Sequence, residues 1–119
     1  MARHEIALFL ELVRRARHNR RLVLALDRDK DLSTITNLGL KQREILDAVA
    51  GLLPEQALNL PWDNRNDHFP NERVCDFGSR LGDTEVYIKV TAGVDDSGDC
   101  GGCVISFHQP ERPLIYPYR

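Results

Sequence analysis

Hydrophobic positions in the first half of the chain recur with the period of a helix. Near the amino end they follow the spacing i, i+3, i+4, i+7, at Ile6, Phe9, Leu10 and Val13. This spacing predicts an amphipathic helix over residues 2–18 that packs on a core. A second helix is predicted over residues 41–53, where Pro54 ends an apolar face made of Ile45, Leu46, Val49, Leu52 and Leu53.

The segments on either side of the second helix carry weaker patterns. Residues 22–26 predict a short strand or an extended segment. Residues 29–40 are rich in turn formers, and we expect turns with one helical turn at residues 33–38. Residues 60–71, LPWDNRNDHFPN, show no period and predict a long loop, of the kind that often serves function. Trp62 and Phe69 are expected to anchor this loop to the body.

In the last third of the chain the period changes from 3.6 to 2. Strands are predicted over residues 73–81, 84–94 and 103–109, with a hairpin tip formed by DDSGDCGG. Alternation divides the middle strand into an apolar and a polar face, with Val86, Ile88 and Val90 opposed to Glu85, Tyr87 and Lys89. The last strand is expected to point Ile105 and Phe107 inward and Ser106 and His108 outward.

These elements predict an α+β fold. Two N-terminal helices are expected to pack on one face of a small antiparallel sheet, whose other face is polar and open to solvent. A chain of 119 residues is large enough for one hydrophobic core. Residues 1–119 are therefore predicted to form a single domain.

Charge is distributed unevenly although the net charge is only −2. Residues 1–30 hold eight basic and four acidic residues, whereas residues 54–103 hold four basic and ten acidic ones. The acidic balance argues against binding nucleic acid by charge alone, although the basic cluster at residues 14–21 allows a local phosphate-facing patch. No apolar run approaches the roughly 20 residues of a membrane span, and the order of charges is wrong for a secretory signal. We expect a cytoplasmic location.

The three cysteines include one CxxC pair, Cys100 and Cys103. An odd number excludes a complete disulfide framework. A zinc site would need two further ligands at short spacing, and the sequence has no second CxxC, CxxH or HxxxH. A glycine turn between two small apolar residues is the favoured interpretation, with a zinc- or redox-linked regulator as the alternative. We expect no metal and no cofactor.

Strand alternation and hairpin pairing bring three reactive side chains together. If the hairpin turns around residues 96–99, Tyr87 and His108 become near neighbours on the polar face, with Lys89 one pleat away. Histidine is the side chain best suited to transfer protons near neutral pH, and cations stabilise charge that grows on a phosphate. Tyr87, Lys89 and His108 are therefore candidate catalytic residues for metal-free RNA cleavage, with Arg112 as a second cation. Alternatively, they are ordinary polar residues of a half-solvated sheet.

The chain continues after His108 as a proline-rich tail. Three prolines within residues 110–117 fix φ and remove backbone donors, so the tail is expected to fold back rather than extend the sheet. It would then place Arg112 and Tyr116 around His108 as substrate-binding residues, with tyrosine faces able to stack unpaired bases. Alternatively, residues 114–116 only cover the edge of the sheet.

Two stretches carry a family resemblance. EVYIKV at residues 85–90 and CVISFHQPERPLIYPY at residues 103–118 resemble the toxins of the motility quorum-sensing regulator (MqsR) family. The upstream order of helix, turn-rich link and helix is similar too. Members of this family are toxins of type II toxin–antitoxin systems that act as mRNA interferases on a RelE-like fold. The resemblance implies an endoribonuclease that cleaves mRNA without a metal and is inhibited by a cognate antitoxin protein.

The functional residues of that family match this chain unevenly. Tyr87 and Lys89 match a tyrosine and a lysine of the family's strand motif, whereas His108 occupies the position where the best-known members carry a catalytic lysine. A further family lysine and a glutamine correspond most nearly to Asn59 and a position close to Cys75, so neither is kept. Either His108 takes over proton transfer, or the mechanism, target or activity differs. The alternative is a non-catalytic module that keeps the toxin fold and acts through protein partners.

Overall fold

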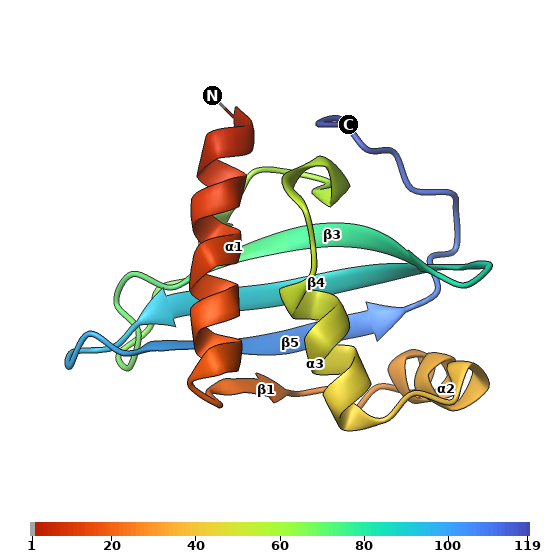
Figure 1. Ribbon diagram of the computed structural model, residues 1–119, viewed down its shortest axis with the longest axis horizontal. Helices are drawn as coiled ribbons and strands as arrows, with labels where there is room; N and C mark the ends of the chain where they lie inside the picture. Colours follow the sequence, from red (N-terminus) through yellow and green to blue (C-terminus); the bar gives the residue numbers. More distant parts are fainter. Residues whose placement is uncertain (1) are drawn as a thin grey trace.

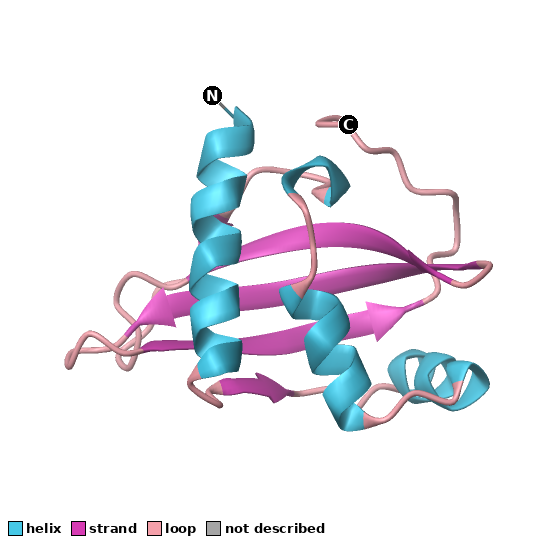
Figure 2. Cartoon of the chain, in the orientation of Figure 1, coloured by secondary structure: helices cyan, strands magenta, loops and turns pink. Residues whose placement is uncertain are grey.

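The computed structural model describes residues 2–119, which form three α-helices, one 3₁₀ helix and five strands (Figure 1, Figure 2). The elements in chain order are α1 (Ala2–His18), β1 (Leu22–Leu24), α2 (Asp29–Leu38), α3 (Gln42–Ala50), η1 (Pro54–Gln56), β2 (Trp62–Asp63), β3 (Arg73–Leu81), β4 (Thr84–Val94) and β5 (Cys100–His108). Among these residues no helix is both long and apolar enough to cross a membrane.

The strands form one sheet in the order β1-β5-β4-β3-β2. Strands β2 to β5 pair with their neighbours antiparallel, whereas β1 pairs parallel with the first half of β5. Helices α1 and α3 lie across one face of the sheet, and α2 lies beside the edge of β5 (Figure 1). The predicted α+β class, with helices on one face of a mostly antiparallel sheet, is confirmed.

One hydrophobic core lies between the helices and the sheet. The apolar stripe predicted for α1 is buried there, and the ring of Phe9 stacks on that of Phe77 in β3 with 6.2 Å between centroids. The sheet contributes fully buried side chains from its three long strands: Phe77, Val86, Ile88, Val90, Val104 and Phe107. Burying each such side chain contributes about 1.5–3 kcal/mol, so this layer supplies the main driving force for folding.

Helix α3 ends at Ala50, three residues earlier than the sequence predicts. Gly51 follows it, and Pro54 begins the 3₁₀ turn η1 rather than ending α3 directly. Proline disfavours helical dihedrals in the residue before it, and Leu53 is indeed extended, with φ −113° and ψ 154°. The intervening Leu52 remains buried in the core, so the apolar pattern of the segment is kept without helix.

Helix α2 is ten residues long, although the sequence predicts only one helical turn in this region. Aspartate, serine and threonine are weak helix formers, and tertiary contacts outweigh that preference here. The fully buried carboxylate of Asp31 accepts the backbone N–H of Phe107 at 2.9 Å, and the Thr34 hydroxyl accepts that of Gln109 at 3.0 Å. Helix α2 therefore satisfies the edge of β5 beyond the point where β1 ends.

The pairing of β4 with β5 shifts by one residue next to Lys89. Lys89 pairs with Ser106 but Val90 pairs with Val104, which leaves Ile105 as the extra residue of a β-bulge. Val104 is fully buried, whereas Ile105 is only partly buried. The prediction that Ile105 points into the core is therefore wrong, because the bulge gives that position to Val104.

The segment at residues 60–71 contains the two-residue strand β2, which pairs with the start of β3. Phe69 anchors this segment, since its ring lies against Gly101 and beneath the guanidinium of Arg21, 5.9 Å from the ring centroid. Trp62 is 40% exposed and is held less firmly than the sequence predicts.

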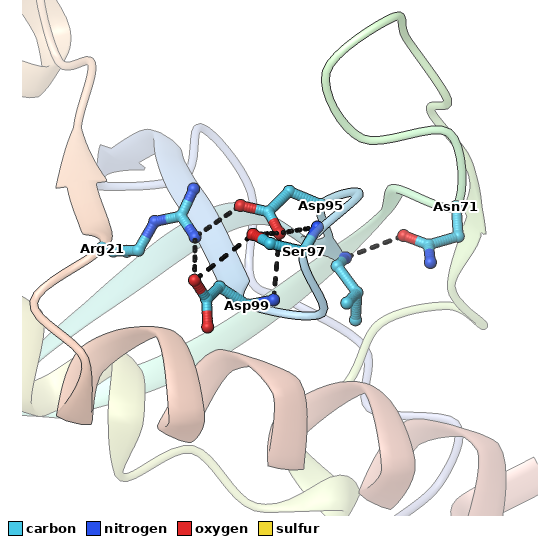
Figure 3. Close-up of polar contacts among 6 residues, drawn as sticks. Arg21, Asn71, Asp95, Ser97 and Asp99 are labelled. Carbon is cyan, nitrogen blue, oxygen red and sulfur yellow. Dashed lines mark hydrogen bonds and ion pairs between the residues drawn. The ribbon is translucent and has the colours of Figure 1, made fainter.

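The β4–β5 hairpin tip is organised by Asp95. One oxygen of this carboxylate accepts the backbone N–H groups of Ser97 and Asp99, and the other lies 2.8 Å from the guanidinium of Arg21 (Figure 3). Asn71 joins the tip by accepting the backbone N–H of the last residue of β4 at 2.8 Å. Hydrogen bonds from Ser97, and then the cation of Arg21, hold the pKa of Asp95 below its usual range. Part of the basic cluster is thus neutralised within the molecule.

Candidate active site

The open face of the sheet carries Tyr87 and His108 side by side. They are direct partners in the β4–β5 ladder, and their rings lie 5.2 Å apart between centroids at an angle of 43°. The register predicted from the hairpin is confirmed for this pair. Lys89 lies two residues along β4 on the same face, opposite Ser106.

A cleft of about 670 Å³ opens over this pair. Helix α2 contributes Lys30 to its wall, and the tail contributes Arg112 together with the backbone around it. The residues that line the cleft are Lys30, Leu58, Tyr87, His108 and the tail segment 109–115. The cleft therefore combines an imidazole, a phenol and two cations with an apolar wall.

The ring orientation of His108 is fixed by its own backbone neighbour. Its Nδ1 lies 3.0 Å from the carbonyl oxygen of Gln109. A carbonyl can only accept, so Nδ1 carries a proton, and Nε2 is the ring atom that can accept a proton when the ring is neutral. The strand end beneath the ring is held by Asp31 and Thr34 of α2, which bind the backbone N–H groups on either side of His108.

Tyr87 presents a neutral phenol. Burial raises its pKa well above the usual value, and the neighbouring carboxylate of Asp76 raises it further. A phenolate is therefore disfavoured, and Tyr87 serves as a hydrogen-bond donor, or as a relay for a proton that His108 supplies, rather than as a base.

Lys89 lies beside the cleft and does not line it. Its ammonium is 4.0 Å from Oδ1 of Asp76 and 5.6 Å from the centroid of the Trp62 ring. The other oxygen of Asp76 accepts a hydrogen bond from Asn59 at 2.9 Å, whereas buried Oδ1 has no hydrogen-bond partner among the described residues. Lys89 thus supplies positive charge one step along the open face from the Tyr87–His108 pair.

The tail folds back over the open face, but its two predicted binding residues separate. Arg112 lines the cleft with His108. Tyr116 lies in a different hollow, where its hydroxyl donates to Glu85 at 3.0 Å. Glu85 also accepts the backbone N–H of Leu114 at 3.1 Å, so one carboxylate holds the tail at two points. A Cβ on Gly78 would overlap the side chains of Tyr116 and Leu114, so the glycine at this strand position leaves room for the tail.

The CxxC segment lies within β5 and is not a turn. Cys100 and Cys103 are three residues apart on this strand, so they point to opposite faces, with Cys100 in the core and Cys103 partly exposed. The two glycines between them allow close approach by the Phe69 ring and the backbone of Thr91. Among residues 2–119 no group of three His, Cys, Asp or Glu side chains could hold a metal ion.

Cys75 does not form a nucleophilic site. The thiol is fully buried, and burial followed by the charge of Asp76 raises its pKa to about 12. The reactive thiolate is therefore scarce at neutral pH.

Sequence reasoning missed Lys30 and Leu58 as cleft residues. Lys30 enters the site only because α2 docks on the end of β5. Leu58 enters it because its backbone N–H donates to the backbone carbonyl of Asp76 at 2.9 Å. The sequence offered one signal for the docking of α2, namely Asp31. An acidic residue within this segment of mixed polar and apolar residues could have indicated a buried hydrogen-bond acceptor.

Comparisons of the chain with protein-family models, with curated proteins and with solved structures find no match. The candidate site therefore stands on its geometry and on the chemistry of its side chains.

Proposed function

We propose that this chain is a metal-independent endoribonuclease that cleaves mRNA, acting as the toxin of a type II toxin–antitoxin system. The observation that carries the proposal is the convergence of His108, Tyr87 and Arg112 in one open cleft. The resemblance of residues 85–90 and 103–118 to MqsR-family toxins supports the same activity and adds mRNA as the substrate. A cytoplasmic location follows from that substrate.

The reaction is attack by a ribose 2′-hydroxyl on the adjacent phosphorus. Nε2 of His108 takes the hydroxyl proton as the O2′–P bond forms, and the P–O5′ bond breaks. The proton then passes from the imidazolium through the Tyr87 hydroxyl to the departing 5′-oxygen, and Tyr87 accepts one proton as it gives up the other, so that no free phenolate forms. The products are a 2′,3′-cyclic phosphate and a 5′-hydroxyl end. This mechanism requires a neutral Tyr87 phenol and a His108 ring that is protonated on Nδ1 and not on Nε2.

Cations stabilise the additional negative charge that develops on the phosphate. Arg112 and Lys30 both line the cleft, one from the tail and the other from α2. Lys89 adds positive charge one step along the strand. Such preorganised groups contribute most when the charge is larger in the transition state than in the bound substrate.

Cleavage of a labelled single-stranded RNA by purified protein in EDTA tests the proposal. We expect fragments with 2′,3′-cyclic phosphate ends, and a rate lowered about 100-fold or more by His108→Ala because proton transfer is lost. His68→Ala is the matched control, since His68 is an exposed loop histidine outside the cleft. Equal cleavage rates for the wild type and His108→Ala would contradict the mechanism. A wild-type protein that cleaves RNA only after a metal ion is added would contradict it as well.

A non-catalytic binding module is the second candidate, favoured by the apolar wall of the cleft. Leu58, Leu114 and Ile115 line it, and Ile115 is 83% exposed. Expression in a bacterial host separates the two candidates. Growth arrest that His108→Ala abolishes and that co-expression of an antitoxin relieves supports the nuclease, whereas harmless accumulation of folded protein supports the module.

A further inference from the structure

Trp62 is an exposed aromatic side chain on the same sheet face as the cleft. It is the only tryptophan in the chain and is 40% exposed in the short strand β2. A partly exposed indole presents a flat apolar ring and an N–H donor, so it can stack on a planar ligand group. Its strand partner Val74 is buried, which fixes the base of the side chain to β3.

The cation nearest to this indole is Lys89. The Lys89 ammonium lies 5.6 Å from the ring centroid, and its closest acidic atom is Oδ1 of Asp76 at 4.0 Å, beyond hydrogen-bond distance. The other Asp76 oxygen is occupied by Asn59. The ammonium thus forms a long ion pair with Asp76 but no hydrogen bond to it, and its N–H donors can bind a phosphate while it remains beside the aromatic ring.

The ladder places this pair in line with the cleft. The Tyr87–His108 rung is followed along β4 by the Lys89–Ser106 rung and then by the rung of Thr91, whose β3 partner Val74 is also the partner of Trp62. Successive rungs on one face are about 7 Å apart. An extended strand of RNA that enters the cleft can therefore continue over Lys89 and reach the indole within a few nucleotides.

We propose that Trp62 and Lys89 form a nucleotide subsite in which an unpaired base of the RNA stacks on the indole and its phosphate binds the ammonium. This subsite deepens the ribonuclease function proposed above and rests on it. It restricts the substrate to single-stranded RNA, because a base held in a duplex does not offer its face to the ring.

The single tryptophan gives a direct measurement of stacking. The probe is a single-stranded 2′-O-methyl RNA, in which the attacking hydroxyl is blocked, titrated into the wild-type protein. We expect saturable quenching of Trp62 emission that coincides with binding measured by anisotropy of the labelled RNA. The same sequence in a duplex is expected to leave the emission unchanged. Binding without any change in emission would overturn the subsite.

Variants provide the second readout. Trp62→Leu keeps an apolar side chain opposite Val74 and is expected to weaken binding at least about fivefold, whereas Trp62→Phe retains most of the affinity. Phe69→Leu is the matched control, because Phe69 lies in the same loop but is packed against Gly101. Circular dichroism verifies that each variant is folded. Equal affinity of Trp62→Leu and the wild type for the single-stranded RNA would contradict the proposal.

The outcomes distinguish the subsite from the nuclease. Cleavage of RNA with no quenching and no effect of Trp62→Leu leaves the nuclease intact and removes the subsite. Quenching in a protein that cleaves no RNA keeps the subsite as a binding site and removes the nuclease. Absence of both binding and quenching overturns the subsite.

Discussion

The β4–β5 hairpin carries a charged cluster at each end, and the two clusters differ in how their polar groups are satisfied. At the tip, Arg21 lies 2.8 Å from Asp95 and 3.8 Å from Asp99, and the carboxylates also bind the turn itself (Figure 3). At the opposite end, Lys30 and Arg112 line the cleft, and their side chains make no ion pair within residues 2–119.

The difference separates a structural cluster from a candidate site. A cation that is already paired would have to lose its partner before it could bind a phosphate, whereas an unpaired cation facing a cleft loses only water. Each end also has a histidine nearby, His68 at the tip and His108 at the cleft. Only His108 is paired across the ladder with a phenol.

The largest expected effect comes from replacing each of the two arginines, Arg112 at the cleft and Arg21 at the tip, with alanine. Arg112→Ala is expected to lower the rate of RNA cleavage about 100-fold and to leave the free energy of unfolding nearly unchanged. Arg21→Ala is expected to do the reverse, lowering the melting temperature with cleavage retained. Parallel cleavage assays and thermal melts of both variants measure this. Similar behaviour of the two variants would remove the distinction between the ends.

The next effect concerns the support of the cleft by α2. Asp31→Ala leaves the backbone N–H of Phe107 without its acceptor and is expected to lower the free energy of unfolding by about 2 kcal/mol. Asp31→Asn keeps an oxygen acceptor and is expected to cost less. Asp29→Ala, an exposed position in the same helix, is the control and is expected to change stability by under about 0.5 kcal/mol. Urea denaturation of the three variants measures these differences.

A smaller effect is expected where the tail crosses the sheet. Gly78→Ala would bring a methyl group against Tyr116 and Leu114, so the tail must shift at a cost of about 1 kcal/mol. Hydrogen exchange of the Leu114 amide, which donates to Glu85, should accelerate in this variant. Glu85→Gln keeps an acceptor and serves as the conservative comparison. Unchanged protection in Gly78→Ala would show that the tail is held by other contacts.

The smallest effect is a difference in pH dependence between the two ends. The raised pKa of Tyr87 means that its contribution to stability is present below about pH 10 and is lost as the pH rises further. The lowered pKa of Asp95 means that its contribution is present above about pH 3.8 and is lost as the pH falls. Tyr87→Phe should flatten the alkaline limb of the stability profile and Asp95→Asn the acid limb. Denaturation midpoints measured across pH test both expectations. A change in the acid limb for Tyr87→Phe, or in the alkaline limb for Asp95→Asn, would contradict them.

The periodic pattern of apolar residues predicted the elements whose buried face can be identified from a short stretch of sequence. The stripe of α1 and the alternation of β4 identified the buried faces of both elements, and the expected hairpin between β4 and β5 is present. Helix α2, the parallel pairing of β1 and the bulge at Ile105 were not predictable in this way. Each depends on a partner many residues away, such as the buried Asp31 that binds the backbone of Phe107.

The candidate site likewise combines features that the sequence predicted with features that depend on distant parts of the chain. Tyr87 and His108 were predicted as neighbours from a turn around residues 96–99 and from the two-residue period of each strand. The pairing is observed, but the ladder next to the turn pairs Val94 with Cys100, and the bulge at Ile105 shifts the register so that Tyr87 meets His108. The docking of the tail was anticipated from its prolines, but its contact points were not. The Glu85 carboxylate accepts the Tyr116 hydroxyl, and Gly78 leaves room for the ring, so Tyr116 lies outside the cleft. The placement of Lys30 in the cleft and of Lys89 beside Trp62 likewise became visible only with the elements assembled.

The sequence by itself determined which residues are buried in α1 and β4, and that Tyr87 and His108 each lie on the polar side of their own strand. Those features follow from periods of 3.6 and 2, which are properties of the backbone and need no distant partner. Only the tertiary structure decided which cations join that pair and which are neutralised elsewhere. The reason is that a side chain's charge is available or satisfied according to neighbours that the chain brings together across 70 or more residues, as it does for Arg21 with Asp95 and for Asp31 with the end of β5.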